Sequence, residues 1–567
     1  MRECYLTAFL SLVVVLAFIA SLSGQTTQAP SDEQAQDESI PVTSPLVRQA
    51  CGSCHRSDAQ GRMTRISYQR TTPEGWQQTI RRMVLLNNLQ IEATDAREVV
   101  RYLANHHGLA PEEAQPAAFE AERRLIDYHY APDRVTEETC TKCHSMGRVI
   151  SQRRTREEWK LLTTMHRGYY PLTDNQAFRR RGRAEAGPDG EVDPRHPVEK
   201  AVDHLAAAFP LNTPEWSAWS ATMRSPRLEG KWALAGQQLG KGPIYGELVV
   251  TAKAGAPDEF ETDVRYVYAR TGDSVTRTGQ AVVYTGFQWR GRSFEVAENE
   301  GLREVLFVER NQQAMSGRWF TGAYDEIGLD VTLRRVRSEP IVLGVHPQAV
   351  RVAASGVTLR IYGANLPDTL TPTDIDLGPG IETTGVTQLT SSGVTVQVAV
   401  APEAVIGARD VFIGSSMLAR AVVVYDEVQR ISVSPATGLA RVGGVVFPKQ
   451  YQSFEARAYH DGPDAEPNTT DDLDLGLVNA TWSLEEYAAT FGDDDTSFVG
   501  WIDANGLFSP AKDGPNPERR NSANNIGDVW VVATLPEPST SKVLRARAHL
   551  LVTVPGYLRR GLSEEGR

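Results

Sequence analysis

Two pentapeptides in this chain carry side chains that could bind a metalloporphyrin. Each reads Cys-x-x-Cys-His, and they span residues 51–55 and 140–144. Two thiols on one helical turn can add to the two vinyl groups of a single haem, and the adjacent histidine then lies beneath the iron as its proximal ligand. The pattern therefore predicts two c-type haems. The side chains assigned to them are Cys51, Cys54 and His55 for the first haem and Cys140, Cys143 and His144 for the second.

A Cys-x-x-Cys pair alone is a weaker indication, because redox dithiols and zinc sites share it. Here the two motifs contain every cysteine except Cys4. Cys4 precedes an apolar run over residues 6–22, which predicts a signal peptide over residues 1–24. An uncleaved anchor is disfavoured because the run is short for a membrane span. The mature chain should therefore be exported, with all its cysteines in the two motifs.

An internal repeat nominates the sixth iron ligands. The residue seven positions after Trp76 is Met83, and the residue seven positions after Trp159 is His166. We therefore expect His55 and Met83 at the first iron and His144 and His166 at the second. The rival ligands are His106 and His107 for the first haem and Met165 for the second.

The choice of ligands has functional consequences. A thioether ligand raises the potential of haem iron, so electrons should run from the second haem to the first. A haem whose two axial positions are both filled by protein is an electron carrier, since oxygen or peroxide chemistry needs an open position.

Helices should position both haems. A leader rich in Gln, Thr, Ser and Pro over residues 25–44 precedes a helical cytochrome part over 45–222, in which each repeat has an attachment helix, a central helix and a closing helix. A polar stretch over 179–200 is predicted to be a surface loop, and its arginines at 179–183 are read as solvated in preference to a site for an acidic partner or a haem propionate.

The rest of the chain alternates apolar and polar residues in short runs, which is typical of β-structure. We expect an antiparallel β-barrel domain over 223–338 and two immunoglobulin-like sandwiches over 339–425 and 426–557. The fold class is thus multidomain, α followed by all-β. The runs assigned to barrel strands are 231–234, 246–251, 263–268, 280–284, 304–309, 316–320 and 328–333.

Composition excludes several functions. A net charge of −12 argues against a nucleic-acid partner. After the signal peptide no segment is apolar enough to span a membrane. Acidic clusters at 461–474 and 493–495 lack the spacing of an EF-hand and are read as solvated loops in preference to calcium sites. Dinucleotide, P-loop, nucleophile-elbow and zinc-helix motifs are absent from the sequence.

The two motifs, the Trp-spaced Met83 and His166, and the domain order together resemble the alpha subunit of bacterial quinohemoprotein amine dehydrogenase. The resemblance covers essentially the whole mature chain. It implies a periplasmic heterotrimer with a β-propeller subunit and a small subunit that carries cysteine tryptophylquinone. That complex oxidises primary amines, and this chain would pass electrons from the quinone to a soluble copper protein or cytochrome c. No catalytic residue would lie in this chain.

Other functions stay open at this point. A dihaem cytochrome c peroxidase-like enzyme would leave one haem without a sixth ligand. The cytochrome subunit of another periplasmic dehydrogenase would share the motifs but have different partners. An extracellular adhesion or scaffold protein would use the β domains and carry the haems incidentally.

Overall fold

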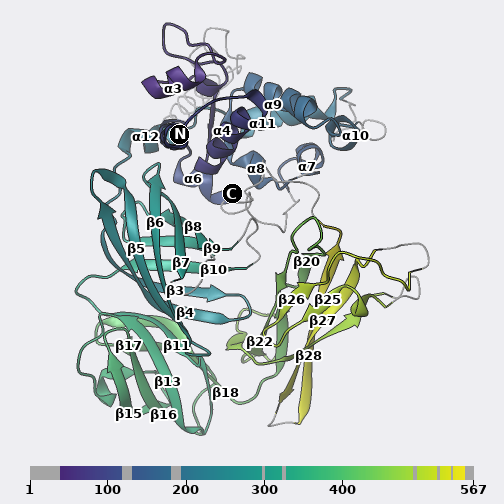
Figure 1. Ribbon diagram of the computed structural model, residues 1–567. Helices are drawn as coiled ribbons and strands as arrows, with labels where there is room; N and C mark the ends of the chain where they lie inside the picture. The colour runs from purple at the N-terminus through teal and green to yellow at the C-terminus, as the bar shows by residue number, and fades with distance from the viewer. Residues whose placement is uncertain are drawn as a thin grey trace, which may run out of the picture.

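The chain folds into a helical N-terminal part followed by a strand-rich remainder (Figure 1). The computed structural model describes residues 39–117, 130–142, 144–179, 193–295, 301–321, 327–488, 494–519, 524–537 and 541–555. The predicted signal peptide, most of the leader and Cys143 lie outside the described residues. Among the described helices, none is long and apolar enough to cross a membrane.

The helical part repeats one three-helix unit. In the first copy the attachment, central and closing helices are α3 (Pro45–Cys51), α4 (Pro73–Asn87) and α5 (Ala93–His106). In the second they are α7 (Arg134–Cys140), α9 (Arg156–Tyr169) and α11 (Pro197–Ala208). Shorter helices accompany them: α6 (Pro111–Ala114), α8 (Gly147–Ile150), α10 (Thr173–Gln176) and α12 (Pro214–Thr222).

Equivalent contacts fix the central helix of each copy. Thr72 and Thr155 cap α4 and α9, each accepting a backbone N–H three residues later, as N-cap threonines do. The indole of Trp76 donates to the carbonyl of His107 at 2.9 Å, and that of Trp159 donates to the carbonyl of Phe209 at 3.3 Å. Each buried tryptophan thus ties its central helix to the end of its closing helix.

The predicted loop over 179–200 was wrong at its end, because α11 already begins at Pro197. Proline is favoured in the first turn of a helix, where its missing N–H is not needed. The ring of His196 accepts the N–H of Val198, and the Glu199 carboxylate accepts the N–H of His196. Residues 180–192 of that stretch lie outside the described residues.

A two-stranded antiparallel sheet joins the two copies, with β1 (Gln69–Thr71) pairing to β2 (Gln152–Arg154). Arg70 on β1 is fully buried, and all five of its N–H donors have acceptors. Two bonds go to the Glu113 carboxylate at 2.7 and 2.9 Å. The others reach the carbonyls of Leu211 and Gly108 and the hydroxyl of Thr213. Arg70 therefore joins both repeats to the start of α12.

The predicted antiparallel barrel is confirmed, and pairing of its last strand with its first closes it. Its strands in chain order are β3 (Gly230–Gln238), β4 (Gly242–Lys253), β5 (Ala256–Tyr268), β6 (Ser274–Tyr284), β7 (Gln288–Glu295), β8 (Gly301–Val308), β9 (Ala314–Phe320) and β10 (Gly328–Arg335). The sequence runs missed β7.

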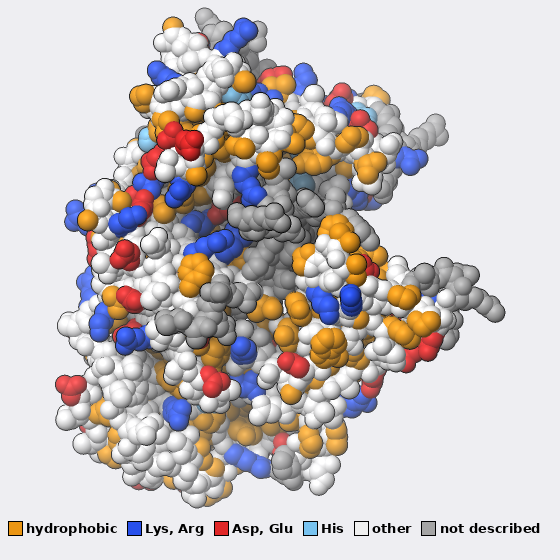
Figure 2. Space-filling view, in the orientation of Figure 1, with side chains coloured by type: hydrophobic (Ala, Val, Ile, Leu, Met, Phe, Trp, Pro, Cys, Tyr) orange, Lys and Arg blue, Asp and Glu red, His pale blue; other side chains and the backbone are white. Residues whose placement is uncertain are grey.

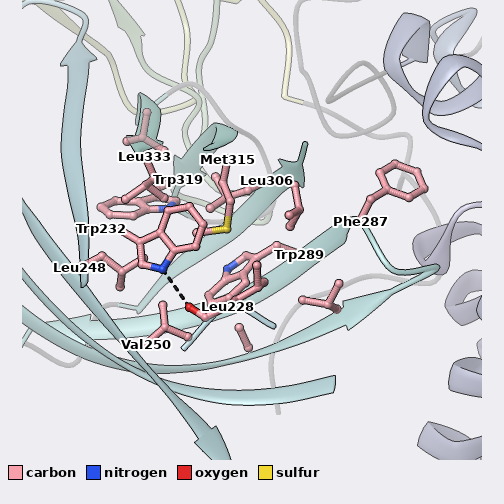
Figure 3. Packing of buried hydrophobic residues seen from close by; sticks show 14 of the residues in the cluster. Leu228, Trp232, Leu248, Val250, Phe287, Trp289, Leu306, Met315, Trp319 and Leu333 are labelled. Carbon is pink, nitrogen blue, oxygen red and sulfur yellow. Dashed lines mark hydrogen bonds between the residues drawn. The ribbon is translucent and has the colours of Figure 1, made fainter. Parts of the chain in front are cut away.

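Three fully buried tryptophans, Trp232, Trp289 and Trp319, lie together in the barrel interior with leucines and Met315 (Figure 3). The indole of Trp232 donates to the carbonyl of Leu228 at 2.9 Å. An eight-stranded barrel is just wide enough for side chains to fill, so this one is a packed core. Its role is that of a scaffold on which the helical part is seated.

The helical part meets the barrel at a cleft of about 430 Å³ between α4, α5 and strands β6 to β8. Lys and Arg side chains lie along this boundary in Figure 2. The arginines that line the cleft are Arg81, Arg97, Arg290, Arg292 and Arg303. Arg290 pairs with the carboxylate of Glu74 on α4, which fixes the first repeat to the barrel.

The next unit places two four-stranded sheets around one core, consistent with a sandwich. One sheet has the order β11 (Ile341–His346), β13 (Ser355–Ala364), β16 (Gly393–Val400), β15 (Ile381–Thr390). The other has the order β12 (Ala349–Arg351), β18 (Ser416–Tyr425), β17 (Gly407–Ile413), β14 (Ile375–Asp376).

The last unit has three sheets around one core. The first is β19 (Arg430–Ser434), β22 (Glu455–His460), β23 (Leu473–Leu477). The second is β20 (Thr437–Arg441), β28 (Lys542–Thr553), β27 (Gly527–Glu537), β24 (Thr481–Glu486). The third is β21 (Gln452–Ser453), β26 (Leu507–Pro510), β25 (Gly500–Ile502).

We expect Glu113→Gln to destabilise the helical part by about 3 to 5 kcal/mol, because removing one partner of a buried ion pair leaves the other charge uncompensated. Urea unfolding followed by the fluorescence of the helical part measures the loss. The control is Lys160→Gln, since the Lys160–Glu157 pair is largely exposed and should contribute less than about 1 kcal/mol. Equal effects of the two substitutions would contradict the role given to Arg70.

Candidate haem-binding sites

The first motif begins where α3 ends. The carbonyl of Cys51 accepts the N–H of Cys54 at 3.3 Å and that of His55 at 2.9 Å, so the helical turn continues through the motif. Cys51 is buried, and Cys54 is exposed. This turn places both thiols and the imidazole within reach of one porphyrin, as covalent attachment requires.

His55 is held in the tautomer that a metal ligand needs. Its Nδ1 lies 2.9 Å from the carbonyl oxygen of Thr64. Since a carbonyl only accepts, Nδ1 carries the proton and Nε2 is left as a free lone pair. Burial lowers the pKa of His55, which also favours the neutral, metal-binding form.

The second motif places two imidazoles opposite each other. The ring centres of His144 and His166 lie 6.4 Å apart. A metal bonded at about 2 Å to each ring nitrogen sets two imidazole centres roughly 6 Å apart, so this separation fits bis-histidine ligation. The Nδ1 atoms donate to the carbonyls of Ser145 at 2.9 Å and Leu162 at 2.8 Å, so the lone pair of each neutral ring is on Nε2.

The surroundings of His166 favour its neutral form. Burial is the largest cause of its lowered pKa, and the positive charges of Arg82 and Arg154 lower the pKa further. A neutral imidazole has a lone pair available for a metal. The residues described around this motif therefore fit a haem, and the bound group would supply a reversible one-electron couple.

The cysteines do not resemble a redox dithiol. Desolvation raises the pKa of the Cys140 thiol to about 12 and also raises that of Cys51. A reactive dithiol needs a lowered pKa, because the thiolate is the nucleophile. Cys143, the predicted partner of Cys140, lies outside the described residues. Among the described side chains, no group of three His, Cys, Asp or Glu residues converges as a metal site.

Met83 takes the place in the first repeat that His166 takes in the second. Both follow the anchored tryptophan of their central helix by seven residues. The side chain of Met83 is half-buried near the end of α4, where its carbonyl accepts the N–H of Leu89 at 3.0 Å. The equivalence supports the prediction that Met83 is the sixth ligand of the first haem.

His107 occupies a core position. The backbone carbonyl of His107 accepts the indole N–H of Trp76, as the carbonyl of Phe209 accepts that of Trp159. The imidazole of His107 is therefore the first repeat's counterpart of the phenyl ring of Phe209. It is fully buried against Trp76, neither ring nitrogen has a hydrogen-bond partner in the described structure, and burial lowers its pKa to about 3. This setting favours packing over ligation.

The other rivals are arranged differently. The ring of His106 packs at a tilt against that of Tyr102, with centres 4.3 Å apart. Met165 neighbours His166 on α9, but the ring that approaches His144 is that of His166. In the acidic cluster at 461–474, Asp461 and Asp472 pair with Arg430. Those two carboxylates are engaged in ion pairs, and the interpretation of the cluster as a solvated loop in preference to a calcium site stays a prediction.

Comparison with protein families explains the domain order. Family models for the quinohemoprotein amine dehydrogenase alpha subunit match the haem-binding domain at 42–187, domain II at 225–336, domain III at 339–426 and domain IV at 431–561. The chain belongs to this family. It is thus a haem-binding subunit of an amine dehydrogenase, which is an oxidoreductase.

The other comparisons add little. No curated protein matches the chain significantly. A redesigned β-barrel is 14% identical, with 19% of this chain and 92% of that chain covered and a TM-score of 0.17. The cadherin-like domains 1 to 4 of zebrafish RET are 11% identical, with 57% and 65% covered and a TM-score of 0.16. Scores this low support no argument about the alpha subunit.

Sequence reasoning missed three arginines of this alpha subunit that lie near the haem motifs: Arg65, Arg82 and Arg154. It considered only the cluster at 179–183, most of which lies outside the described residues. The sequence held one indication of these arginines, because Arg82 directly precedes Met83, the predicted iron ligand. The position of Arg154 beside His166 required the tertiary structure.

We expect His166→Ala to convert one of the two haems from low-spin to five-coordinate high-spin, because that iron loses an axial ligand. Electron paramagnetic resonance of the oxidised subunit measures the change. Met165→Leu is the matched control and should leave both haems low-spin. The reverse outcome, with Met165→Leu giving the high-spin signal, would assign the ligand to Met165.

His107→Phe should flatten the acid dependence of stability. The folded pKa of His107 is about 3, so the unfolded chain takes up a proton below about pH 6.5 that the folded chain cannot. Wild-type stability should fall by about 1.4 kcal/mol per pH unit from this residue alone as the pH drops from about 6.5 towards 3. Urea titrations at a series of pH values measure the difference. Parallel curves would contradict it.

Proposed function

We propose that this alpha subunit is a dihaem electron carrier. Its two c-type haems would be attached through Cys51 and Cys54, and through Cys140 and Cys143. The axial pairs would be His55 with Met83 and His144 with His166. The opposition of His144 and His166 at 6.4 Å carries this proposal, since it offers the iron a protein ligand on each face. An iron closed in this way exchanges electrons and leaves bond-making elsewhere.

The amine chemistry would belong to other subunits of a heterotrimer. In this proposal a small subunit bearing cysteine tryptophylquinone oxidises primary amines, and a β-propeller subunit completes the complex. The alpha subunit accepts electrons from the quinone and passes them to a soluble copper protein or cytochrome c. Family membership supports this assignment, because the family is one subunit of a multi-subunit amine dehydrogenase.

The order of transfer follows from the ligands. Thioether ligation gives the first haem the higher potential, so electrons would enter at the His144 haem and leave through the His55 haem.

The location and domains complete the proposal. The signal peptide over 1–24 would export the chain to the periplasm, where c-type haems are attached. The mature chain would comprise a leader to residue 44, the cytochrome domain at 45–222, the barrel at 223–338 and immunoglobulin-like domains at 339–425 and 426–557. The barrel and sandwiches would hold the cytochrome domain against the partner subunits.

Purification of the native complex tests the proposal. Mass spectrometry of the alpha chain should show two covalently added haems, and a primary amine should reduce both haems only when the partner subunits are present. Peroxide should not reoxidise the reduced subunit rapidly, because neither iron has an open position. Fewer than two haems, or rapid peroxide turnover, would overturn the assignment and favour a peroxidase.

A further inference from the structure

Arg65, Arg82 and Arg154 form a cluster of positive charge at the junction of the two repeats, with Glu158 as their carboxylate. The Nε of Arg65 donates to Glu158 at 2.8 Å, and Nη1 of Arg154 lies 3.7 Å from the same oxygen. Burial is the main cause of the lowered pKa of Arg154 and of Arg82, and the neighbouring guanidinium charges lower both values further. Three cations therefore share one described anion.

Arg82 is the least satisfied of the three. Its Nε is buried and has no hydrogen-bond partner among the described residues, while one terminal nitrogen donates to the hydroxyl of Thr79 at 3.2 Å. Arg154 is also buried and donates to the side-chain amide of Gln152, a neutral group. Among the described residues Arg82 thus has no carboxylate partner, and Arg154 shares the Glu158 carboxylate with Arg65.

Glu158 cannot balance the cluster. Burial raises the pKa of this carboxyl even though Arg65 and Arg154 act to lower it. A buried charge is costly unless it is paired and hydrogen-bonded. Arg70, by contrast, has a hydrogen-bond acceptor for every N–H donor of its guanidinium group. Among the described residues, the three arginines therefore lack a second anion beside Glu158.

The cluster adjoins residues of both candidate haem sites. Arg65 follows Thr64, whose carbonyl holds His55, and it adopts a left-handed backbone with φ of +68°. A non-glycine residue in that conformation is strained and is retained only where the surroundings require it. On the other side, Arg82 precedes Met83, and Arg82 and Arg154 both act on His166.

The helices that carry the two sixth ligands also meet there. Asn87 near the end of α4 donates to the hydroxyl of Tyr169 at the end of α9 at 3.1 Å. Tyr169 and Tyr170 lie near the Arg82 guanidinium. The cluster is thus bounded by both central helices.

We propose that Arg65, Arg82 and Arg154 bind the propionate carboxylates of the two haems and so form a cationic bridge between them. This inference rests on the proposed function, which itself brings these anions to the junction. Guanidinium and carboxylate match in charge and geometry, and such paired bonds are among the strongest hydrogen bonds in proteins. The bridge favours the reduced form of each iron, because reduction removes one positive charge near the cluster.

Arg82→Gln in the full-length holoprotein tests the bridge. Spectroelectrochemical titration should show a lower midpoint potential for at least one haem, and resonance Raman spectra should show a shifted propionate bending band. Arg82→Lys keeps the charge and should hold the potential near the wild-type value. The matched control is Arg156→Gln, since Arg156 is an exposed arginine on α9 that pairs with Asp203 and should change neither signal.

The failure of this inference can be told from the failure of the proposed function. Two covalent haems with unchanged potentials and propionate bands in Arg82→Gln would overturn the bridge and leave the carrier intact. A wild-type chain with fewer than two haems would overturn the carrier itself. If Arg82→Gln does not fold, Arg65→Gln alters a half-exposed member of the cluster and should lower the potential of the His55 haem. An unchanged potential in that variant would equally overturn the bridge.

Discussion

The buried ion pair of Arg70 and Glu113 is the constraint on which the arrangement of this subunit depends. It joins the β1–β2 sheet, the end of the first repeat and the start of α12 at one point. Arg153 approaches the same carboxylate from β2 at 3.1 Å. Because the charges are shielded from water, their geometry is fixed, and so is the angle at which the second repeat meets the first.

That junction holds two copies of the same three-helix unit together. The repeats share their capping threonines and anchored tryptophans, but they differ where chemistry is expected. Met83 stands where the second repeat has His166, and His107 stands where it has Phe209. The exchange between Met83 and His166 would separate the potentials of two otherwise similar haems. The exchange between His107 and Phe209 leaves an imidazole at a packed core position. The second exchange makes His107 a cost in stability at acid pH.

Two arginine clusters lie within this junction, and their charge balance differs. The Arg70 cluster is saturated with acceptors from the chain itself and therefore serves structure. The Arg82 cluster is short of anions and lies beside both iron sites. A protein tolerates such an imbalance where a bound group completes it. The barrel is filled by its own tryptophans and provides a packed base for the helical part.

The sequence by itself was enough to predict the chemistry, because thioether attachment and iron ligation depend on residue type and local spacing. It also predicted a barrel, since alternating apolar residues mark half-buried strands. It missed β7, whose Arg290-Gly-Arg292 segment breaks the alternation, because that strand is held by pairing to β6 and β8. The pairing of β1 with β2, the approach of His166 to His144 and the gathering of three arginines around Glu158 were decided only in the tertiary structure. Those contacts join residues far apart in the chain, and no local pattern encodes a distance between them.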